Sequence, residues 1–133
     1  MHAYDYAVIR VVPRVERGEF VNVGVVLSCK QGGLLAARIE VDEARLRALA
    51  PGLDVDLVRA HLAAFPAICA GGPAAGPIGL LSSRERFHWL TAPRSTIVQT
   101  SPVHTGRCAD AQAMLDRLLD TMVRAPRGGD GNG

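Results

Sequence analysis

Two apolar runs near the start of the chain constrain its fold more than any other feature. Residues 4–12 (YDYAVIRVV) and 20–29 (FVNVGVVLSC) are rich in β-branched and aromatic side chains, which is typical of β-strands. The polar segment between them predicts a turn, and the glycines of Lys30–Gly33 predict a hairpin that leads into a third strand over residues 34–40. The first third of the chain therefore predicts an antiparallel meander.

The second run also predicts which of its side chains are buried. Alternate residues of a strand point to the same face of a sheet, and the apolar residues of this run recur at every second position. We therefore expect one core face made of Val21, Val23, Val25, Leu27 and Cys29.

Helices are predicted wherever a capping residue precedes an apolar stripe. The side chains of Asp42, Asp54, Ser82 and Asp110 can each accept a hydrogen bond from the free backbone N–H groups at the start of a helix. Glu85 follows Ser82 at the spacing of a capping box. Each of the four residues is therefore predicted to begin a helix.

The helix after Asp54 carries an apolar stripe and a proline near its end. The stripe runs from Leu57 through His61 to Phe65, so His61 is predicted to be a buried core histidine. Pro66 has no backbone N–H, and we expect it to kink or split the helix.

A fourth strand is predicted over residues 95–101, which are rich in hydroxyl and β-branched side chains. Pro102 cannot donate a hydrogen bond to a sheet, so we expect it to end this strand. The residues that follow, His104–Gly106, are predicted to form a loop before the last helix.

Together these elements predict a single α+β domain over residues 1–126, followed by a flexible Gly-rich tail over residues 127–133. The predicted sheet is antiparallel, has about four strands, and is packed by three to five helices. A length of 133 residues fits one domain with its own core.

Composition gives the class of protein but no partner. A hydrophobic content of 48%, a charged content of 21% and a net charge of +2 are close to the globular average. Lys30 is the only lysine among 15 basic residues, as expected of a GC-rich bacterial genome. Cys29, Cys69 and Cys108 are odd in number and far apart, so we expect reduced thiols in the bacterial cytoplasm and predict no metal and no cofactor.

The segment Leu62–Ser83 contains no charged residue and has about the ~20 residues that a membrane-spanning helix needs. Its prolines and glycines would leave backbone groups without hydrogen bonds in lipid. We therefore expect a buried helix followed by a tight loop, and no membrane span.

The segment Arg84–Arg107 is the best candidate for a binding site, because it combines arginines, histidines, hydroxyls and the only tryptophan. Guanidinium and hydroxyl groups are the usual ligands of phosphate. The candidate ligands of such an anion are Arg86, Arg94, Arg107, Ser95, Thr96 and Thr105. The alternative is that Arg94–Ser95 forms a turn and the hydroxyls cover a solvated strand face.

His104 is the candidate catalytic acid or base, because an imidazole exchanges protons near neutral pH. Ser95 or Ser101 could act as a nucleophile with His104 as its base, although no nucleophile elbow surrounds either serine. A structural histidine that binds a backbone carbonyl is the alternative.

The first hairpin is the second candidate region. Arg10 and Asn22 are candidate ligands, because Asn22 and Gly24 leave room for a close approach beside Phe20. The alternative is a solvated hairpin whose Arg14 and Arg17 pair with Glu16 and Glu19.

Two segments carry a family resemblance. Residues 4–6 leading into AVIRVVPRVERGEFVNVGVVL, and the later RFHWLTAPRSTIVQTSPVHTG, resemble bacterial domain-of-unknown-function family number 3037 over about residues 4–124. The family brings no activity, cofactor or catalytic residue. The resemblance implies a partner or regulator role, since such genes often lie beside one for a kinase-like protein similar to the HipA toxins.

Three functions follow from these observations. The first is a bacterial accessory domain that binds a protein partner, such as a HipA-like kinase-type protein encoded nearby. The alternative is a small enzyme or ligand sensor that binds a phosphorylated or nucleotide-like anion through Arg86, Arg94 and His104. The last is a weak nucleic-acid-binding module, against which the low net charge and the few aromatic residues argue. The sequence decides neither whether the chain is an enzyme nor its oligomeric state.

Overall fold

The N-terminal apolar runs form the predicted antiparallel meander in the computed structural model, which describes residues 1–124. Its strands are β1 (His2–Val11), β2 (Val21–Cys29) and β3 (Leu34–Ile39). A short 3-10 turn, η1 (Val15–Arg17), joins β1 to β2, and Gly33 adopts a φ of +64° in the hairpin before β3. The predicted tail over residues 127–133 lies outside the described residues.

The other edge of β1 pairs with two short strands in succession, β4 (Val98–Thr100) and β5 (His104–Cys108). The prediction of a loop at His104–Gly106 is therefore wrong. Ile9 pairs with Thr100 and Tyr6 with His104, so the chain takes one extra residue between the two strands. Pro102 lies in this irregular stretch, so β4 ends before it as expected, and β5 resumes the pairing with β1 beyond it.

A β-bulge in the middle of β2 makes the prediction of a single core face wrong. Arg10 pairs with Asn22 and Ile9 with Gly24, which leaves Val23 as an extra residue without a partner on β1. A bulge shifts the alternation of side chains by one position. Val23 consequently packs on one face of the sheet and Val25 on the other.

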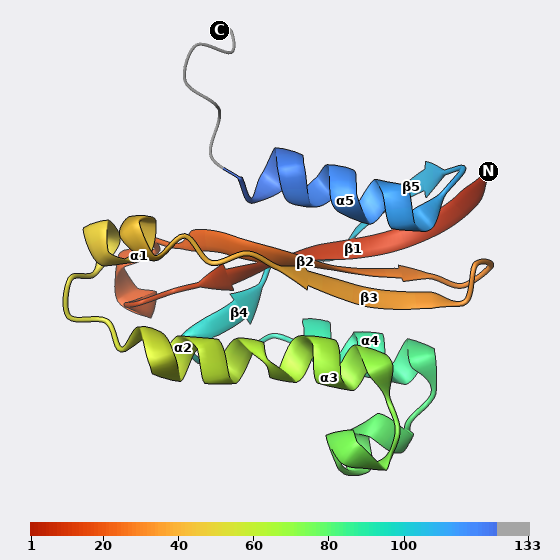
Figure 1. Cartoon of the computed structure of the whole chain (residues 1–133), viewed down its shortest axis with the longest axis horizontal. Helices are drawn as coiled ribbons and strands as arrows, with labels where there is room; N and C mark the ends of the chain where they lie inside the picture. Colours follow the sequence, from red (N-terminus) through yellow and green to blue (C-terminus); the bar gives the residue numbers. More distant parts are fainter. Residues whose placement is uncertain (125–133) are drawn as a thin grey trace, which may run out of the picture.

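Helices cover both faces of the sheet, so the domain has three layers (Figure 1). On one face lies α5 (Ala111–Met122), and the core beneath it includes Val25, Leu27 and Leu115; we call this the α5 face. The opposite face, the α2–α4 face, has a second core around Ile9, Phe65 and Phe87. Its helices and the 3-10 turns between them are α2 (Val55–Leu62), α3 (Ala64–Ala70), η2 (Pro73–Ala75), η3 (Pro77–Leu80) and α4 (Ser83–Thr91). The short helix α1 (Glu43–Leu49) connects β3 to this layer.

The four predicted N-caps are confirmed. Asp42, Asp54 and Asp110 each accept a hydrogen bond from a backbone N–H in the first turn of α1, α2 and α5. Ser82 and Glu85 exchange the two hydrogen bonds of a capping box at α4. The fold class is therefore as predicted, an α+β domain on an antiparallel sheet, with five strands where about four were expected.

Pro66 splits its helix as predicted, since α2 ends at Leu62 and α3 begins at Ala64. The prediction of a buried His61 is wrong, because this side chain is exposed. The buried stripe begins at Val55, continues along the helix and leaves Leu57 49% exposed on the opposite side. Val55 and Leu57 lie on different sides of an α-helix, and His61 is on the same side as Leu57. Because the side that carries Val55 faces the core, His61 faces solvent.

Candidate functional site

Arg86 lies on α4 and contacts the end of α3. Its Nη1 donates to the carbonyl oxygens of Ile68 at 2.7 Å and Cys69 at 2.8 Å, and its Nε donates to Leu81 O at 3.1 Å. The last carbonyl groups of a helix have no partner within the helix. The guanidinium group therefore serves the α3 terminus, and two of its nitrogens are already engaged by the protein backbone.

Arg94 stacks on the tryptophan of α4. The carbon at the centre of its guanidinium group lies 4.3 Å from the centroid of the Trp89 ring, and Arg94 Nη2 donates to Trp89 O. Partial burial lowers the pKa of Arg94 from its ordinary value. The pair lies on the α2–α4 side of the sheet, where Trp89 is 40% exposed.

His104 lies on the other side of the sheet from Arg94. It pairs with Tyr6 across β5 and β1, with 5.4 Å between the ring centroids, and Tyr6 packs against the core beneath α5. The sheet therefore separates His104 from Arg94, and these two residues do not form one hydrogen-bonded site.

Thr105 points to the face opposite His104, because adjacent residues of a strand alternate. Thr105 Oγ1 donates to Asp5 Oδ1 at 2.8 Å, and Arg84 Nη1 lies 2.7 Å from Asp5 Oδ2. This chain of contacts joins β5, β1 and α4. It ties the edge of the sheet to the helical layer, so Thr105 has a structural partner.

The remaining residues of the predicted anion site are also dispersed. Ser95 and Arg107 are exposed, and Arg107 pairs with Ala3 near the far end of β5. Thr96 Oγ1 donates to Val98 O at 2.7 Å and closes the turn before β4. The structure therefore does not bring the predicted ligands of the Arg84–Arg107 segment together.

Ser101, one of the two candidate nucleophiles, is buried at the junction of β4 and β5. Its Oγ accepts a hydrogen bond from Val8 N at 2.8 Å and donates to Pro102 O at 2.9 Å. The hydroxyl thus replaces a backbone partner where the edge strand is irregular. These two hydrogen bonds satisfy the hydroxyl group, as buried polar groups require.

Arg10 and Asn22 meet across β1 and β2 on the α5 face. The Arg10 guanidinium carbon lies 4.1 Å from the Phe20 ring centroid, and Asn22 Nδ2 donates to Met122 O at the end of α5 at 2.9 Å. Arg10 Nε and Asn22 Oδ1 are buried without a hydrogen-bond partner among the described residues. Asn22 therefore fastens the end of α5 to the sheet, and Arg10 stacks on Phe20 beside it.

The room predicted beside Gly24 is taken by the neighbouring strand. A Cβ atom on Gly24 would lie 2.6 Å from Arg38 O and 2.9 Å from Ile39 Cδ1. The close approach that requires this glycine is therefore the approach of β3, and no ligand groove forms there.

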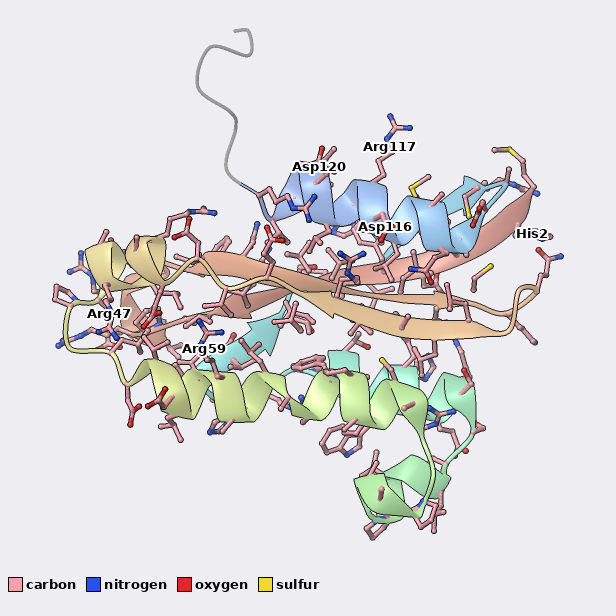
Figure 2. The ribbon with its side chains drawn as sticks, viewed as in Figure 1. His2, Arg47, Arg59, Asp116, Arg117 and Asp120 are labelled. Atoms are coloured by element: carbon pink, nitrogen blue, oxygen red, sulfur yellow. The ribbon has the colours of Figure 1, made fainter. Side chains whose placement is uncertain are left out.

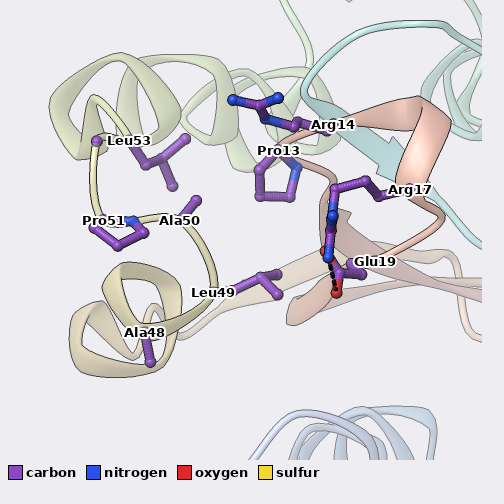
Figure 3. Close-up of a pocket in the computed structure, with 10 residues that line it drawn as sticks. Pro13, Arg14, Arg17, Glu19, Ala48, Leu49, Ala50, Pro51 and Leu53 are labelled. Carbon is purple, nitrogen blue, oxygen red and sulfur yellow. Dashed lines mark hydrogen bonds and ion pairs between the residues drawn. The ribbon is translucent and has the colours of Figure 1, made fainter.

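A cavity of about 640 Å³ opens between η1 and the connection from α1 to α2 (Figure 3). Arg17 and Glu19, on its wall, form the predicted ion pair. Arg14 lines the same cavity and makes no ion pair with the described residues, so its predicted pairing with Glu16 is not found. The rest of the lining is Pro13, Ala48, Leu49, Ala50, Pro51, Gly52 and Leu53. Apart from the Arg17–Glu19 ion pair, Arg14 is the one charged side chain of this lining, which does not indicate a particular ligand.

The three cysteines are free thiols that are buried in the two cores. Cys29 and Cys108 lie beneath α5, whereas Cys69 lies in the core of the α2–α4 face. Among residues 1–124, no group of three or more His, Cys, Asp or Glu side chains is arranged to hold a metal ion.

We expect Cys69 to be unreactive and to make stability fall at alkaline pH. Burial raises the pKa of its thiol from 9.0 to about 12, although nearby Arg86 opposes the rise. Between these two values the unfolded chain loses a proton that the folded chain keeps, so the free energy of unfolding decreases as pH rises through this window. Urea unfolding of the native chain and of Cys69→Ala, from pH 8 upward, measures the difference in slope.

Cys69→Ala should show the shallower decline, whatever constant stability its smaller side chain costs. Parallel profiles for the two proteins above pH 9 would contradict the assignment. A thiol reagent at pH 8 should label Cys69 only after unfolding, and this label serves as the control for burial.

The most distinctive surface belongs to the helical layer on the α2–α4 face. Within this layer, α3 contacts η2, η3 and α4, and η3 contacts η2 and α4. The exposed residues of positions 63–81 carry no charge, and we call them the uncharged surface: Ala63, Ala64, Pro66, Ala67, Ala70, Pro73, Ala74, Pro77, Leu80 and Leu81. Leu80 is 70% exposed, the largest value among the leucines that project into solvent. No helix within residues 1–124 is both long and apolar enough to cross a membrane.

The sequence shows that the segment Leu62–Ser83 has no charged residue, and from this we predicted a buried helix. The prediction holds for Phe65, Ile68 and Cys69, which face the sheet. The other side of α3 faces away from the core with small apolar residues, because alanine and proline tolerate either environment and give no periodic signal. The signal that could have identified the surface is the absence of charge over both sides of the helix.

The comparisons with known proteins agree with the sequence resemblance. A family model described as a protein of unknown function, DUF3037, matches residues 6–123, nearly the whole chain. The chain therefore belongs to the DUF3037 family, as its two characteristic segments indicated. Neither the comparison with curated proteins nor the comparison with solved structures gives a match.

Proposed function

We propose that this chain is an accessory domain without enzymatic activity that binds a protein partner through the uncharged surface. The observation that carries the proposal is the exposure of Leu80 and Leu81 beside the alanine and proline side of α3. Contiguous apolar surface that faces water on a folded domain is characteristic of protein interfaces.

The surface combines features that a protein interface uses. Leu80 is an apolar side chain on a short 3-10 turn, and burying most of it would contribute about 1.5 kcal/mol. Trp89 lies on α4, which contacts both α3 and η3, and partly exposed tryptophan residues often contribute much of a binding energy. The stacked Arg94 supplies a charged rim at this tryptophan.

The partner we favour is the HipA-like kinase-type protein that the family resemblance implies. The dispersal of Arg86, Arg94 and His104 over two sides of the sheet leaves the anion-binding alternative without an assembled site. An apolar docking surface requires no such convergence.

The proposal is tested by purifying the chain with a HipA-like kinase-type protein from the same genome and measuring their affinity by biolayer interferometry. Leu80→Asp should weaken binding at least tenfold, because it places a charge in a desolvated contact. Leu57→Asp is the matched control: Leu57 is also exposed, but it lies on α2 outside the uncharged surface. It should bind like the native chain.

Two results would count against the proposal. The first is a failure of the two proteins to co-purify, with no change in the activity of the kinase-like protein. The second is equal binding by Leu80→Asp and the native chain while both keep the same circular dichroism spectrum.

A further inference from the structure

The two edges of the sheet differ in how well they are protected against pairing with another strand. The β4 and β5 edge is divided into strands of three and five residues, shifts its register by one residue, and contains Pro102. Short strands, irregular register and proline are the devices by which natural sheets avoid adding strands. The edge formed by β3 has none of these three features, although α3 and α5 contact the strand from its two faces.

The β3 edge has six consecutive residues in regular register with β2. In Figure 1 its ribbon is drawn in front of β2, between α5 above and α3 below. Arg38 is the only charged residue in the strand, and it is neutralised by an ion pair with Asp116 of α5. Figure 2 labels Asp116 on the side of α5 toward the sheet and Arg117 pointing away from it.

The register identifies which backbone groups of β3 are free. Glu40 N donates to Val23 O at 2.7 Å, so Glu40 points its backbone toward β2. Hydrogen-bonded and non-hydrogen-bonded positions alternate along an antiparallel pair. The N–H and C=O groups that point away from β2 therefore belong to Leu35, Ala37 and Ile39, and none of them has another hydrogen-bond partner among residues 1–124.

We propose that two copies of this chain join β3 to β3 in antiparallel orientation about a two-fold axis through Ala37, forming one continuous sheet. In this register Ala37 lies opposite its copy, and Leu35 lies opposite Ile39 of the second copy. The two-fold axis repeats the Leu35–Ile39 pair on the other side of Ala37, so there are three pairs in all. Each pair exchanges two hydrogen bonds, and the joint therefore contains about six.

The side chains fit this register. Leu35, Ala37 and Ile39 pack against the core of the α2–α4 face, so the joint extends that core with apolar pairs and a small residue on the axis. On the α5 face, Arg38 lies opposite Ala36 of the second copy and keeps Asp116 as its own partner. No charge at the joint is left without its partner.

The neighbouring registers are worse. A shift in one direction places Arg38 directly opposite its copy, and like charges at facing positions are destabilising. A shift in the other direction requires Gly33 to pair, but its φ of +64° belongs to the hairpin turn and not to a strand. A second copy of this chain can therefore pair with the β3 edge in a single preferred register. This pairing uses only residues of the chain itself.

Sedimentation velocity of the purified chain should give twice the mass of one chain. Ala37→Pro should give the mass of one chain with an unchanged far-UV circular dichroism spectrum, because the lost N–H group is unused within the chain. Ala36→Pro is the matched variant: its N–H donates to β2, so it should lower the melting temperature instead.

Cross-linking tests the register. Ala37→Cys should form a disulfide between two chains under mild oxidation, because its copy lies directly opposite. Leu34→Cys should not, because two copies of residue 34 lie about 20 Å apart in this register. The natural cysteines are buried and serve as an internal control.

A single-chain mass for the native protein at every concentration would overturn the proposal, as would a dimer that Ala37→Pro leaves intact or cross-linking through residue 34. The native chain could instead be monomeric alone and bind another protein through β3, with Ala37→Pro abolishing that binding. This result would assign the edge to the other protein and would also overturn the proposal. The outcome does not depend on the uncharged surface, because these experiments contain no partner.

Discussion

Replacement of Arg86 by methionine is expected to lower the free energy of unfolding by about 3 kcal/mol. For a domain of this size that loss corresponds to a fall of about 10 °C in melting temperature. Methionine keeps most of the aliphatic length of arginine, so the variant isolates the guanidinium group. Thermal and urea unfolding followed by circular dichroism measure the change.

The size of the effect follows from what Arg86 holds together. Its guanidinium group donates to Ile68 O and Cys69 O at the end of α3, and to Leu81 O at the entry to α4. Removing it leaves partly buried carbonyl groups without donors, which costs more than losing the same bonds at an exposed site. Gly71 adds to the constraint, since a Cβ atom there would lie 3.0 Å from Arg86 Nη1.

Two variants make this expectation specific. Arg86→Lys should recover only part of the loss, because one ammonium group cannot reproduce the planar fork that reaches both helices. Arg59→Met is the control, since Arg59 is half exposed and lies 3.8 Å from Glu43, and it should change stability by less than about 1 kcal/mol. Equal stabilities for Arg86→Met and Arg59→Met would show that the bonds of Arg86 are not needed.

The parts of the fold that the sequence predicted are those governed by neighbouring residues. Caps at Asp42, Asp54 and Ser82 depend on one side chain and the three residues after it, so they can be identified without tertiary information. The same holds for the hairpin at Gly33 and for the break at Pro66. Local chemistry fixed each of these features.

The features that sequence reasoning missed depend on distant residues. The strand β5 exists because His104–Cys108 meets the free edge of β1, and nothing in its own composition separates it from a polar loop. The bulge at Val23 depends on how β1 and β2 align. Pattern reasoning assumes an unbroken period, so a single inserted residue reversed the predicted orientation of half the strand.

The structure does not bring the predicted site residues together, for a related reason. Arg86, Arg94 and His104 are close in the sequence, but α4 and β5 lie on different layers, so their side chains are separated by the sheet. Proximity in sequence predicts proximity in space only within one element. The uncharged surface was visible in the sequence as an absence of charge, but its exposure depends on which side of α3 meets the sheet.

Gly24→Ala is expected to destabilise the domain by about 3 kcal/mol, close to the upper end for inserting one methyl group into a packed interior. The added Cβ atom would lie 2.6 Å from Arg38 O, a backbone atom of β3 that cannot move without disturbing the ladder. Ile39 Cδ1 at 2.9 Å and Ile9 Cδ1 at 3.3 Å close the remaining space. Gly24→Val should be worse still, because it adds two further methyl groups.

Gly52→Ala is the control that distinguishes a steric conflict at Gly24 from a general effect of replacing glycine. A Cβ atom on Gly52 would meet nothing within 4 Å, so Gly52→Ala should be neutral or stabilise by up to about 1 kcal/mol through the unfolded chain. If Gly24→Ala proved as stable as Gly52→Ala, β3 would have to lie farther from β2 than its register requires. In that case the close approach of β3 would not be what requires glycine at position 24.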